Sequence, residues 1–403
     1  MSTILNATNR TNAIGHDEGF SLLEVLVSTA VMLTVTAGIF SVMNPATGAF
    51  SREPEVADTQ QRLRVATDTL YKDLVMAGGG AYSGTQAGTL SYFFASVLPY
   101  RQGLTLDDPP GTYKTDTITL MYVPTTSAQT TISQPMPASS AELKVNAEPQ
   151  CDKADCLCGF KGGMNVLIYD DTGSYDNFTI TEVQCPAAHL QHNLNDLAKQ
   201  YDTNSKIVQV ADHTYYLNAQ TSQLMHYDGS NAPDTPVVDN VVGLNFEYYG
   251  DPQPPTLIKP LSDPAGPWTT YGPKPPALTQ KTTAYPVGEN CAFQVVGGFQ
   301  VPRLAVLGAG GSTLVQLKKA DLDGSDPNVA WCPDAANPNR FNANLLRIRK
   351  IVVTLRVQTA AAALRGPASA LFTNGGTALQ ANKWIPDQEI RFQVTPRNLN
   401  LGR

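Results

Sequence analysis

Charged residues are scarce in this 403-residue chain, and basic residues do not predominate among them. Asp, Glu, Lys and Arg make up only 16% of the sequence, and the formal net charge is −7 at pH 7. Proteins that bind nucleic acid usually show a basic excess, so no nucleic-acid partner is expected. The chain has 31 Gly and 29 Pro, and this composition favours a turn-rich β protein over a helical bundle.

Catalytic signatures are also missing. The sequence has no G-x-S-x-G, no H-E-x-x-H and no G-x-x-x-x-G-K-[ST] motif. The histidines show no metal-ligand spacing; they are His16, His189, His192, His213 and His226. His189 and His192, three residues apart, are expected to be ordinary surface residues. We therefore expect neither an enzyme nor a bound cofactor.

One acidic run resembles a metal-binding loop. Asp321, Asp323 and Asp326 alternate around Gly324, and such carboxylates can gather on Ca²⁺. The run lacks the later Glu of an EF-hand, so an Asp/Gly turn is favoured and a structural Ca²⁺ is kept as the alternative. A second acidic group near Gly173 is interpreted in the same way; it consists of Asp170, Asp171 and Asp176.

Six cysteines follow the N-terminal apolar segment: Cys151, Cys156, Cys158, Cys185, Cys291 and Cys332. An even number in an exported domain favours disulfides, and the pairing stays open. The alternative is a metal site formed by the first four. Their C-x₄-C-x-C spacing with one lone partner differs from the paired units of structural zinc sites, so disulfides are preferred.

A single long apolar run lies near the N-terminus. Residues 20–43 read FSLLEVLVSTAVMLTVTAGIFSVM, with Glu24 as the only charge. A helix of this length can cross a bilayer, and the run is too long for the apolar part of a signal peptide. A carboxylate within such a helix is costly and is usually paired and functional. A cut between Gly19 and Phe20 would place a new amino terminus four residues from Glu24, where the two charges could neutralise each other.

The segment from Gly19 to Val27 (GFSLLEVLV) resembles the processing site of type IV prepilins. That family has Gly before the cut, a methylated Phe after it and Glu at the fifth mature position. The resemblance implies that prepilin peptidase cuts after Gly19 and methylates the Phe20 amine, and that Glu24 pairs with this amine in a neighbouring subunit. This leader departs from the family pattern, because Arg10 is its only Lys or Arg and Asp17 and Glu18 precede Gly19.

The resemblance also implies a place in the cell and a set of partners. The chain would sit in the bacterial inner membrane as a single-pass protein with a periplasmic domain, and then pass to the pilus and the cell surface. Its partners would be other pilins through the N-terminal helix, prepilin peptidase and the inner-membrane assembly platform. Twitching motility and adhesion are the processes that such fibres serve.

A second helical pattern follows the apolar run. Asn44-Pro45 predicts an end or a kink in the first helix. Apolar or small residues then form one stripe between about Glu55 and Ala77, at Val56, Leu63, Ala66, Leu70, Leu74 and Ala77. The glycines at 78–80 predict its end. The stripe is expected to pack on a sheet of the same chain.

The rest of the chain reads as β structure. Alternating segments predict strands at 116–123, two around a turn in 163–183, a hairpin from 207–217 and 222–228, and strands at 237–249, 346–358 and 389–395. Leu244, Phe246 and Tyr248 should share one face. The ten prolines in 251–286 predict a loop rather than a core element.

Together these patterns predict an α+β fold: a long N-terminal helix, half membrane and half amphipathic, packed on an antiparallel β-sheet with large insertions. The expected divisions are a leader (1–19), the membrane and assembly helix (20–43), the amphipathic half (44–80) and a β-rich globular domain (81–403). Insertions are expected near 124–160 and 251–340.

Four later segments resemble PilW-type minor pilins: QQRLRVATDTLYKDLVMAGGG, LMHYDGS with VVDNVVGLNFEYYGD, RIRKIVVTLRVQ and EIRFQVTPRNLN. This resemblance implies a minor pilin that promotes the start of fibre assembly at or near the tip. The alternatives are a J-type pseudopilin of a type II secretion system and a pilus-borne adhesin. For an adhesin, the candidate contact regions are 251–286 and 151–185.

Overall fold

The structure is a computed structural model. It describes residues 19–81, 88–125, 128–147, 151, 157, 159–192, 197–260, 262–263, 268–281, 285–326, 329–333, 337 and 339–401, without the side chains of 44–51. The chain divides into two compact units, residues 1–55 and 56–403. The predicted leader lies outside the described residues except for Gly19.

Helix α1 spans Leu22–Met76 and is the longest element. Ser21 and Glu24 cap its first turn reciprocally. After Met76 the chain turns at Gly78, whose φ is +77° and where an added Cβ would lie 2.4 Å from Leu399 Cδ2. Only glycine fits this position, because the conformation is left-handed and the space is filled. The predicted helix end at 78–80 is therefore confirmed.

Of the end or kink predicted at Asn44–Pro45, the end is wrong, because the helix continues past these residues. Residues 44 and 45 lie within the continuous span of α1. Proline removes one backbone donor, but the remaining hydrogen bonds of the adjacent turns still hold the helix. Helices with long apolar segments tolerate proline in this way, since an open backbone would leave more polar groups unsatisfied.

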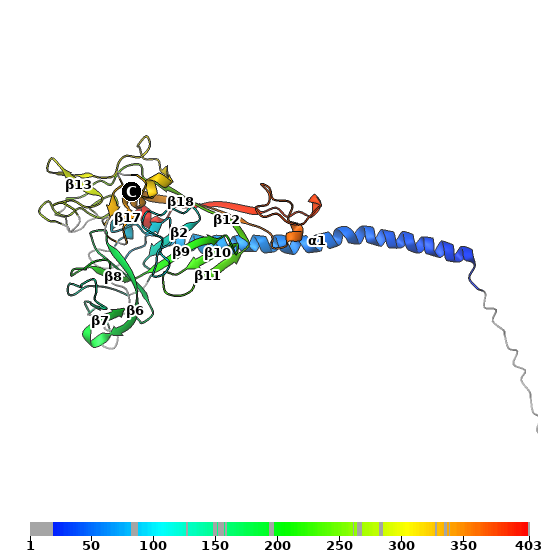
Figure 1. The fold of residues 1–403 in the computed structure, drawn as a ribbon, viewed down its shortest axis with the longest axis horizontal. Helices are drawn as coiled ribbons and strands as arrows, with labels where there is room; N and C mark the ends of the chain where they lie inside the picture. Colours follow the sequence, from blue (N-terminus) through cyan, green and yellow to red (C-terminus); the bar gives the residue numbers. More distant parts are fainter. Residues whose placement is uncertain are drawn as a thin grey trace, which may run out of the picture. The chain divides into compact units, whose positions relative to one another are not determined.

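Two antiparallel sheets form the centre of unit 56–403 (Figure 1). The five-stranded sheet has the order β1-β2-β9-β10-β11, with bounds Val97–Leu98, Thr117–Tyr122, Ala211–Asn218, Gln223–Tyr227 and Thr235–Asp239. The four-stranded sheet has the order β15-β12-β18-β19, with bounds Val315–Leu317, Val241–Gly250, Ile348–Val357 and Gln388–Val394.

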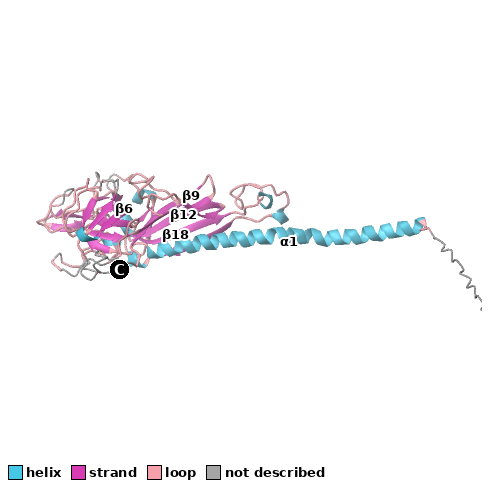
Figure 2. Cartoon of the chain, turned by 90° about the horizontal axis from the view of Figure 1, so that it is seen from below, coloured by secondary structure: helices cyan, strands magenta, loops and turns pink. Residues whose placement is uncertain are grey.

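Strands of both sheets lie beside the end of α1 (Figure 2), and all three share one hydrophobic core. Ala66, Leu70 and Leu74 of α1 are fully buried in it, together with Ala77 just after the helix, while Leu63 packs at its margin. The predicted inward faces are also confirmed. Leu244, Phe246 and Tyr248 on β12 are buried, as are their partners on β18: Ile351, Val353 and Leu355. The stripe predicted for residues 55–77 therefore packs on a sheet of the same chain.

A six-stranded antiparallel sheet lies between β2 and β9 in the chain. Its order is β3-β8-β5-β6-β7-β4, with bounds Gln129–Thr131, Lys206–Gln209, Asn165–Tyr169, Tyr175–Gln184, His189–His192 and Glu142–Lys144. Strand side chains alternate between faces. Leu167 and Tyr169 accordingly join the main core, whereas Val166 and Ile168 join a second hydrophobic cluster on the other face. The strands of this sheet lie between residues 129 and 209 of the chain.

Two predicted β segments each divide between two sheets. Residues 207–217 separate at Val210 into β8 and β9, although the hairpin of β9 and β10 is confirmed. Residues 237–249 separate at Asn240 into β11 and β12. Asn240 has a φ of +59°, a left-handed conformation that asparagine tolerates better than most residues. The other predicted strands correspond to β2, β5, β6, β18 and β19.

Short elements complete the described chain. The strands are β13 (Phe293–Val296), β14 (Phe299–Pro302), β16 (Trp331–Cys332) and β17 (Phe341–Asn342), and the helix is α2 (Lys319–Leu322). The 3₁₀ helices η1–η6 span Leu90–Tyr92, Cys185–Ala187, Ala343–Arg347, Ala362–Leu364, Ala381–Lys383 and Arg397–Asn400.

The proline-rich segment 251–286 has no strand among its described residues. One of its side chains is nevertheless part of the core. Tyr271 is 2% exposed, belongs to the main hydrophobic cluster, and donates a hydrogen bond of 2.6 Å to the Gln253 carbonyl. The prediction of a loop rather than a core element is correct for the described residues, and Tyr271 anchors this loop to the core.

Candidate functional site

The first described residues form an exposed capping motif. The Ser21 N–H donates to Glu24 Oε2 at 3.0 Å, and the Glu24 N–H donates to Ser21 Oγ at 3.2 Å. This reciprocal pair satisfies two of the backbone donors that a helix start leaves open. Phe20 precedes the motif and is 86% exposed. The predicted processing residues Gly19 and Phe20 are therefore accessible, and Glu24 lies one turn beyond them.

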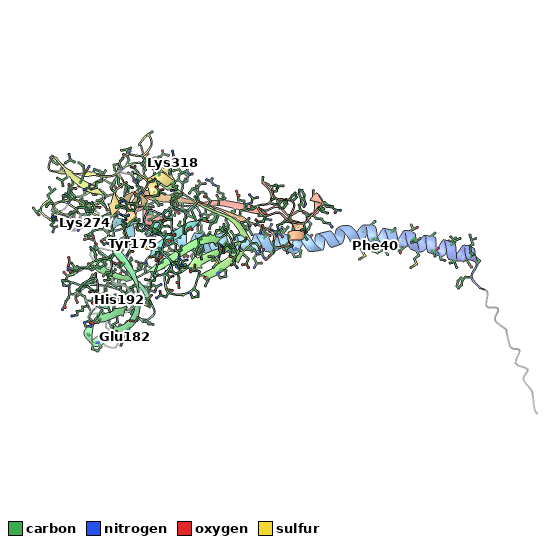
Figure 3. All side chains as sticks on the ribbon, viewed as in Figure 1. Phe40, Tyr175, Glu182, His192, Lys274 and Lys318 are labelled. Atoms are coloured by element: carbon green, nitrogen blue, oxygen red, sulfur yellow. A yellow bond between two sulfur atoms is a disulfide. The ribbon has the colours of Figure 1, made fainter. Side chains whose placement is uncertain are left out.

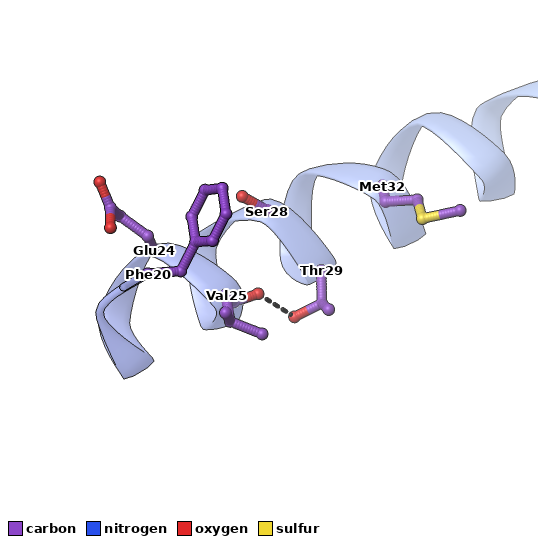
Figure 4. A pocket seen from close by; sticks show the side chains of 6 residues that line it. All are labelled: Phe20, Glu24, Val25, Ser28, Thr29 and Met32. Atoms are coloured by element: carbon purple, nitrogen blue, oxygen red, sulfur yellow. Dashed lines mark hydrogen bonds between the residues drawn. The ribbon is translucent and has the colours of Figure 1, made fainter. Parts of the chain in front are cut away.

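A shallow groove runs along one face of this helix start (Figure 4). It is lined by Phe20, Glu24, Val25, Ser28, Thr29 and Met32. The Thr29 hydroxyl donates to the Val25 carbonyl at 2.9 Å, so its polar group is satisfied inside the helix. The groove offers a largely apolar face, with the Glu24 carboxylate at one end.

Leu22–Met43 has a mean hydropathy of 2.1 and none of it is buried; by length and composition it is the one described helix segment that could cross a membrane. Large apolar side chains protrude on all sides, among them Phe40, which is 66% exposed (Figure 3). A helix that is apolar all round needs an apolar environment. Unit 1–55 supplies none from its described residues.

The described cysteines are oxidised. Cys291 and Cys332 form a disulfide with a Cα–Cα distance of 5.2 Å, and Cys151 and Cys185 are also disulfide-bonded. Cys156 and Cys158 lie outside the described residues. For the four cysteines that are described, the disulfide prediction is confirmed.

The carboxylates of the Asp321–Asp326 run serve local structure. Asp321 Oδ2 accepts from the Lys318 N–H at 2.7 Å and caps α2. Asp323 accepts from the N–H of Ser325 at 3.0 Å and forms an ion pair with Lys319. Within the described ranges, no three His, Cys, Asp or Glu side chains are placed to hold a metal ion. These contacts are those of an Asp/Gly turn.

The second acidic group is divided among separate partners. Asp170 pairs with Lys199, and Asp171 with Lys206 and Lys274. Asp176 points elsewhere and accepts a hydrogen bond of 2.8 Å from the Tyr201 hydroxyl. Burial raises the pKa of Asp176 to about 6.

Asp176 also lines a polar cavity of about 150 Å³. Its walls come from the loop after β1, from β6 and from residues near 197 and 339, and include Gln102, Asp107 and Asn177. Burial raises the pKa of Asp107 to about 6. Next to this cavity, burial raises the pKa of Asp212 on β9 to about 8. The carboxyls here therefore favour the protonated form more strongly than exposed aspartates do.

The histidines differ from the sequence prediction. His189 and His192 lie on strand β7, and His189 contacts Glu142 of β4. His192 is 2% exposed and packs against Phe178, so the prediction of a surface residue is wrong for it. Burial lowers the pKa of His192. His16 lies outside the described residues.

The structure brings together two histidines that the sequence did not connect. His213 Nδ1 and His226 Nε2 are 2.7 Å apart on the neighbouring strands β9 and β10. Close by, Asp73 of α1 accepts hydrogen bonds from the hydroxyls of Tyr122 and Tyr215 at 2.9 and 2.6 Å. The predicted hairpin could have indicated this contact. Pairing its two strands in register places the two histidines diagonally opposite each other on the same face.

No model of a known protein family matches this chain, and no curated protein matches it either. The functional assignment therefore depends on the residues themselves. The strongest candidate site is the N-terminal segment, in which Gly19, Phe20 and Glu24 stand in a fixed order before an exposed apolar helix.

Proposed function

We propose that this chain is a minor pilin of a type IV pilus, which promotes the start of fibre assembly and lies at or near the tip. The observation that carries the proposal is the order Gly19, Phe20 and Glu24 at the entrance of an apolar helix that its own unit leaves uncovered. In this function the helix crosses the inner membrane before assembly and packs among other pilin helices afterwards.

The exposed apolar helix supports this two-stage role. Leu22, Leu33 and Val42 are each at least 70% exposed. Burying one such side chain contributes about 1.5–3 kcal/mol, so the whole face provides a large driving force toward a bilayer or a bundle of helices. The processing experiment below tests whether this helix is retained in the mature protein.

Glu24 supplies specificity in the proposed assembly. Cleavage after Gly19 would create an amine on Phe20, and a carboxylate in apolar surroundings is strongly favoured to pair with such a charge. Within one chain, Glu24 Oε2 already accepts from the Ser21 N–H. A carboxylate has further acceptor sites, so the amine of a neighbouring subunit can be bound without losing this cap.

The size of the β-rich part supports a place near the tip. The described residues of unit 56–403 form three sheets of four to six strands and an extensive core. A subunit of this bulk would crowd a tightly packed helical shaft, whereas a terminal position imposes no such limit. Prepilin peptidase, the assembly platform and other pilins are the partners that this function requires.

The first test is the mature N-terminus, measured by mass spectrometry on the parent and on Gly19→Ala. The parent is expected to start at Phe20 with one added methyl group, and Gly19→Ala should retain residues 1–19. Gly38→Ala is the matched control, since neither Gly19 nor Gly38 has a neighbouring atom within 4 Å of an added Cβ. A parent that keeps its first 19 residues, or is cut elsewhere, would overturn the proposal.

The second test is Glu24→Gln, which keeps the size of the side chain and removes its charge. We expect normal processing and membrane insertion, but loss of this subunit from purified fibres. Immunoblots of sheared pili measure the effect, with Thr34→Val as a control in the same helix. Incorporation equal to that of the parent would separate Glu24 from assembly.

A J-type pseudopilin of a type II secretion system would use the same helix and processing site. The two are discriminated by the genes that flank this one and by the defect that deletion causes. Loss of surface pili supports the pilus assignment, and loss of protein secretion with pili intact supports the pseudopilin.

An adhesin function is favoured by a different observation. The β13–β14 hairpin exposes Val296 and Phe299, the latter at 75%. Deleting 251–286 would not test adhesion cleanly, because Tyr271 belongs to the core. Phe299→Ser is the better variant: adhesion should fall while piliation is unchanged, and unchanged adhesion would count against this role.

A further inference from the structure

The loop between β18 and β19 is long and nearly uncharged. It comprises residues 358–387, which leave β18 after Val357 and return to β19 at Gln388. From 357 to 382 the only charged residue is Arg365, whereas charged residues make up 16% of the whole chain. Exposed loops normally carry charged side chains, because these are the residues that water solvates best. The β18–β19 loop therefore differs from an ordinary solvated loop.

This loop has a small core of its own. The rings of Phe372 and Trp384 meet edge to face with their centroids 5.5 Å apart, and Leu364, Phe372 and Ile385 are buried. The Trp384 Nε1–H donates to the Ala378 carbonyl at 3.1 Å, and the Ile385 N–H donates to the Leu364 carbonyl at 2.8 Å. These contacts give the loop a defined backbone path.

Apolar side chains protrude from this fixed backbone. Leu379 is 98% exposed and Leu371 is 51% exposed. Leu379 follows Ala378, whose carbonyl and N–H are both hydrogen-bonded within the loop, so its side chain is held outside the small core. Six alanines of the loop are exposed as well: Ala360, Ala362, Ala363, Ala368, Ala370 and Ala381. Apolar surface with so little charge favours contact with an apolar partner.

The strand register places the loop within unit 56–403. Val357 pairs with Gln388 at one end of the β18–β19 ladder, and Val394 pairs at the other end. Beyond Val394, the Asn398 side chain donates to the Met76 carbonyl at 3.1 Å, so that end lies next to the C-terminal end of α1. A strand rises about 3.4 Å per residue, which puts the loop roughly 20 Å away. Because β18 lies beside α1 (Figure 2), the loop is displaced toward the turn at which α1 enters the unit.

The same chain carries an apolar helix that needs a bilayer. The apolar segment ends at Met43 and the unit begins at Val56. The chain between them is helical, which corresponds to about 20 Å at 1.5 Å per residue. We propose that the β18–β19 loop contacts the lipid surface of the bilayer that holds residues 22–43. The inference rests on the proposed function, because the helix has to hold the chain in a membrane before assembly.

The chemistry of the loop suits the boundary between lipid headgroups and acyl chains. Its backbone polar groups are bonded internally, since the Gly376 N–H donates to the Gly366 carbonyl and the Thr377 N–H to the Ala362 carbonyl, both at 2.8 Å. Internal bonding lowers the cost of leaving water. The exposed Lys383 follows the uncharged stretch, where its charge can meet anionic headgroups while the apolar side chains enter the boundary.

The test uses the full chain in liposomes of phosphatidylglycerol and phosphatidylcholine with brominated acyl chains, which quench tryptophans that reach the lipid. Leu379→Trp adds a probe at a 98% exposed position, so the fold does not depend on it. We expect bromine to quench about half of the added emission, after subtraction of the parent, which has three Trp. Phe299→Trp is the matched control on the β13–β14 hairpin, which Figure 1 shows at the far end of the unit; bromine should not quench it.

Flotation of the parent with the liposomes separates this inference from the proposed function. If the parent floats but bromine leaves the added emission of Leu379→Trp unchanged, the loop contact is overturned and the membrane helix stands. A shift of that emission to shorter wavelength without quenching would also overturn it, because a second copy of the chain would then cover the loop. Equal quenching of Leu379→Trp and Phe299→Trp would show contact without a preferred surface. A parent that does not float would overturn the membrane helix itself.

Discussion

The two ends of helix α1 carry similar apolar residues but differ in what covers them. Between Leu22 and Met43 none of the chain is buried, whereas Ala66, Leu70 and Leu74 are fully buried against the sheets of their own unit. The sequence differs in the same sense, because the first segment is apolar on all sides and the second on one stripe. The spacing of the apolar residues, rather than their number, indicates which half of α1 is buried against strands of its own unit.

The carboxylates of the two halves repeat this contrast. Glu24 is exposed and accepts from the backbone of its own first turn. Asp73 is 5% exposed and accepts from two tyrosine hydroxyls of the five-stranded sheet. A buried carboxylate with satisfied hydrogen bonds contributes to the fold, while an exposed one in an apolar helix is available to a partner.

A pair of leucine substitutions tests whether the two halves of α1 contribute differently to the stability of the protein. Leu70→Ala should lower the free energy of unfolding of unit 56–403 by about 2–5 kcal/mol, since it removes a fully buried side chain and leaves a cavity. Leu33→Ala should change it by less than about 0.5 kcal/mol, because Leu33 is 70% exposed. Chemical denaturation followed by tryptophan fluorescence measures both. Equal losses would mean that the first half of α1 packs on the β-rich unit.

The carboxylates offer a second, smaller test. Asp73→Asn should cost about 1–3 kcal/mol, since an amide has one acceptor oxygen for the two hydroxyls of Tyr122 and Tyr215. Glu24→Gln should leave the same unfolding transition unchanged. The same denaturation experiment reports both, and Tyr215→Phe gives a control that removes one donor instead. A stabilising effect of Asp73→Asn would show that burial of the charge outweighs its hydrogen bonds.

The elements with long, regular alternation could be predicted from the sequence. Strand β18 and the buried stripe of α1 follow from apolar spacing alone, because each packs one face against a single core. The divisions at Val210 and Asn240 could not be predicted, since the apolar pattern continues while the chain passes from one sheet to another. Asn240 has a left-handed backbone conformation at the point where the chain passes from β11 to β12, but the sequence does not reveal this conformation.

The candidate sites also differ in how far they could be predicted from the sequence. Gly19, Phe20 and Glu24 form a local motif, so they could be identified without a fold. His213 and His226 come together only through the register of β9 and β10. The burial of Tyr271 within a proline-rich segment likewise depends on packing that is distant in sequence.

The last test concerns pH and the buried carboxyl of Asp212. Burial raises the pKa of Asp212 to about 8, against about 3.9 in an unfolded chain. The unfolded state loses this proton first, so the protonated carboxyl contributes its full stability below about pH 4 and loses it as the pH rises toward 8. Asp212→Asn mimics the neutral form.

We expect Asp212→Asn to match the parent near pH 4 and to exceed it by about 1 kcal/mol or more at pH 8.5. Thermal or chemical unfolding at several pH values measures the difference. Asp263→Asn is the control at a half-buried carboxyl, which forms an ion pair with Lys259. A constant difference between Asp212→Asn and the parent would show that Asp212 is ionised in the folded protein throughout this range. The buried carboxylate of Asp212 would then be stabilised by its hydrogen-bond partners rather than by protonation.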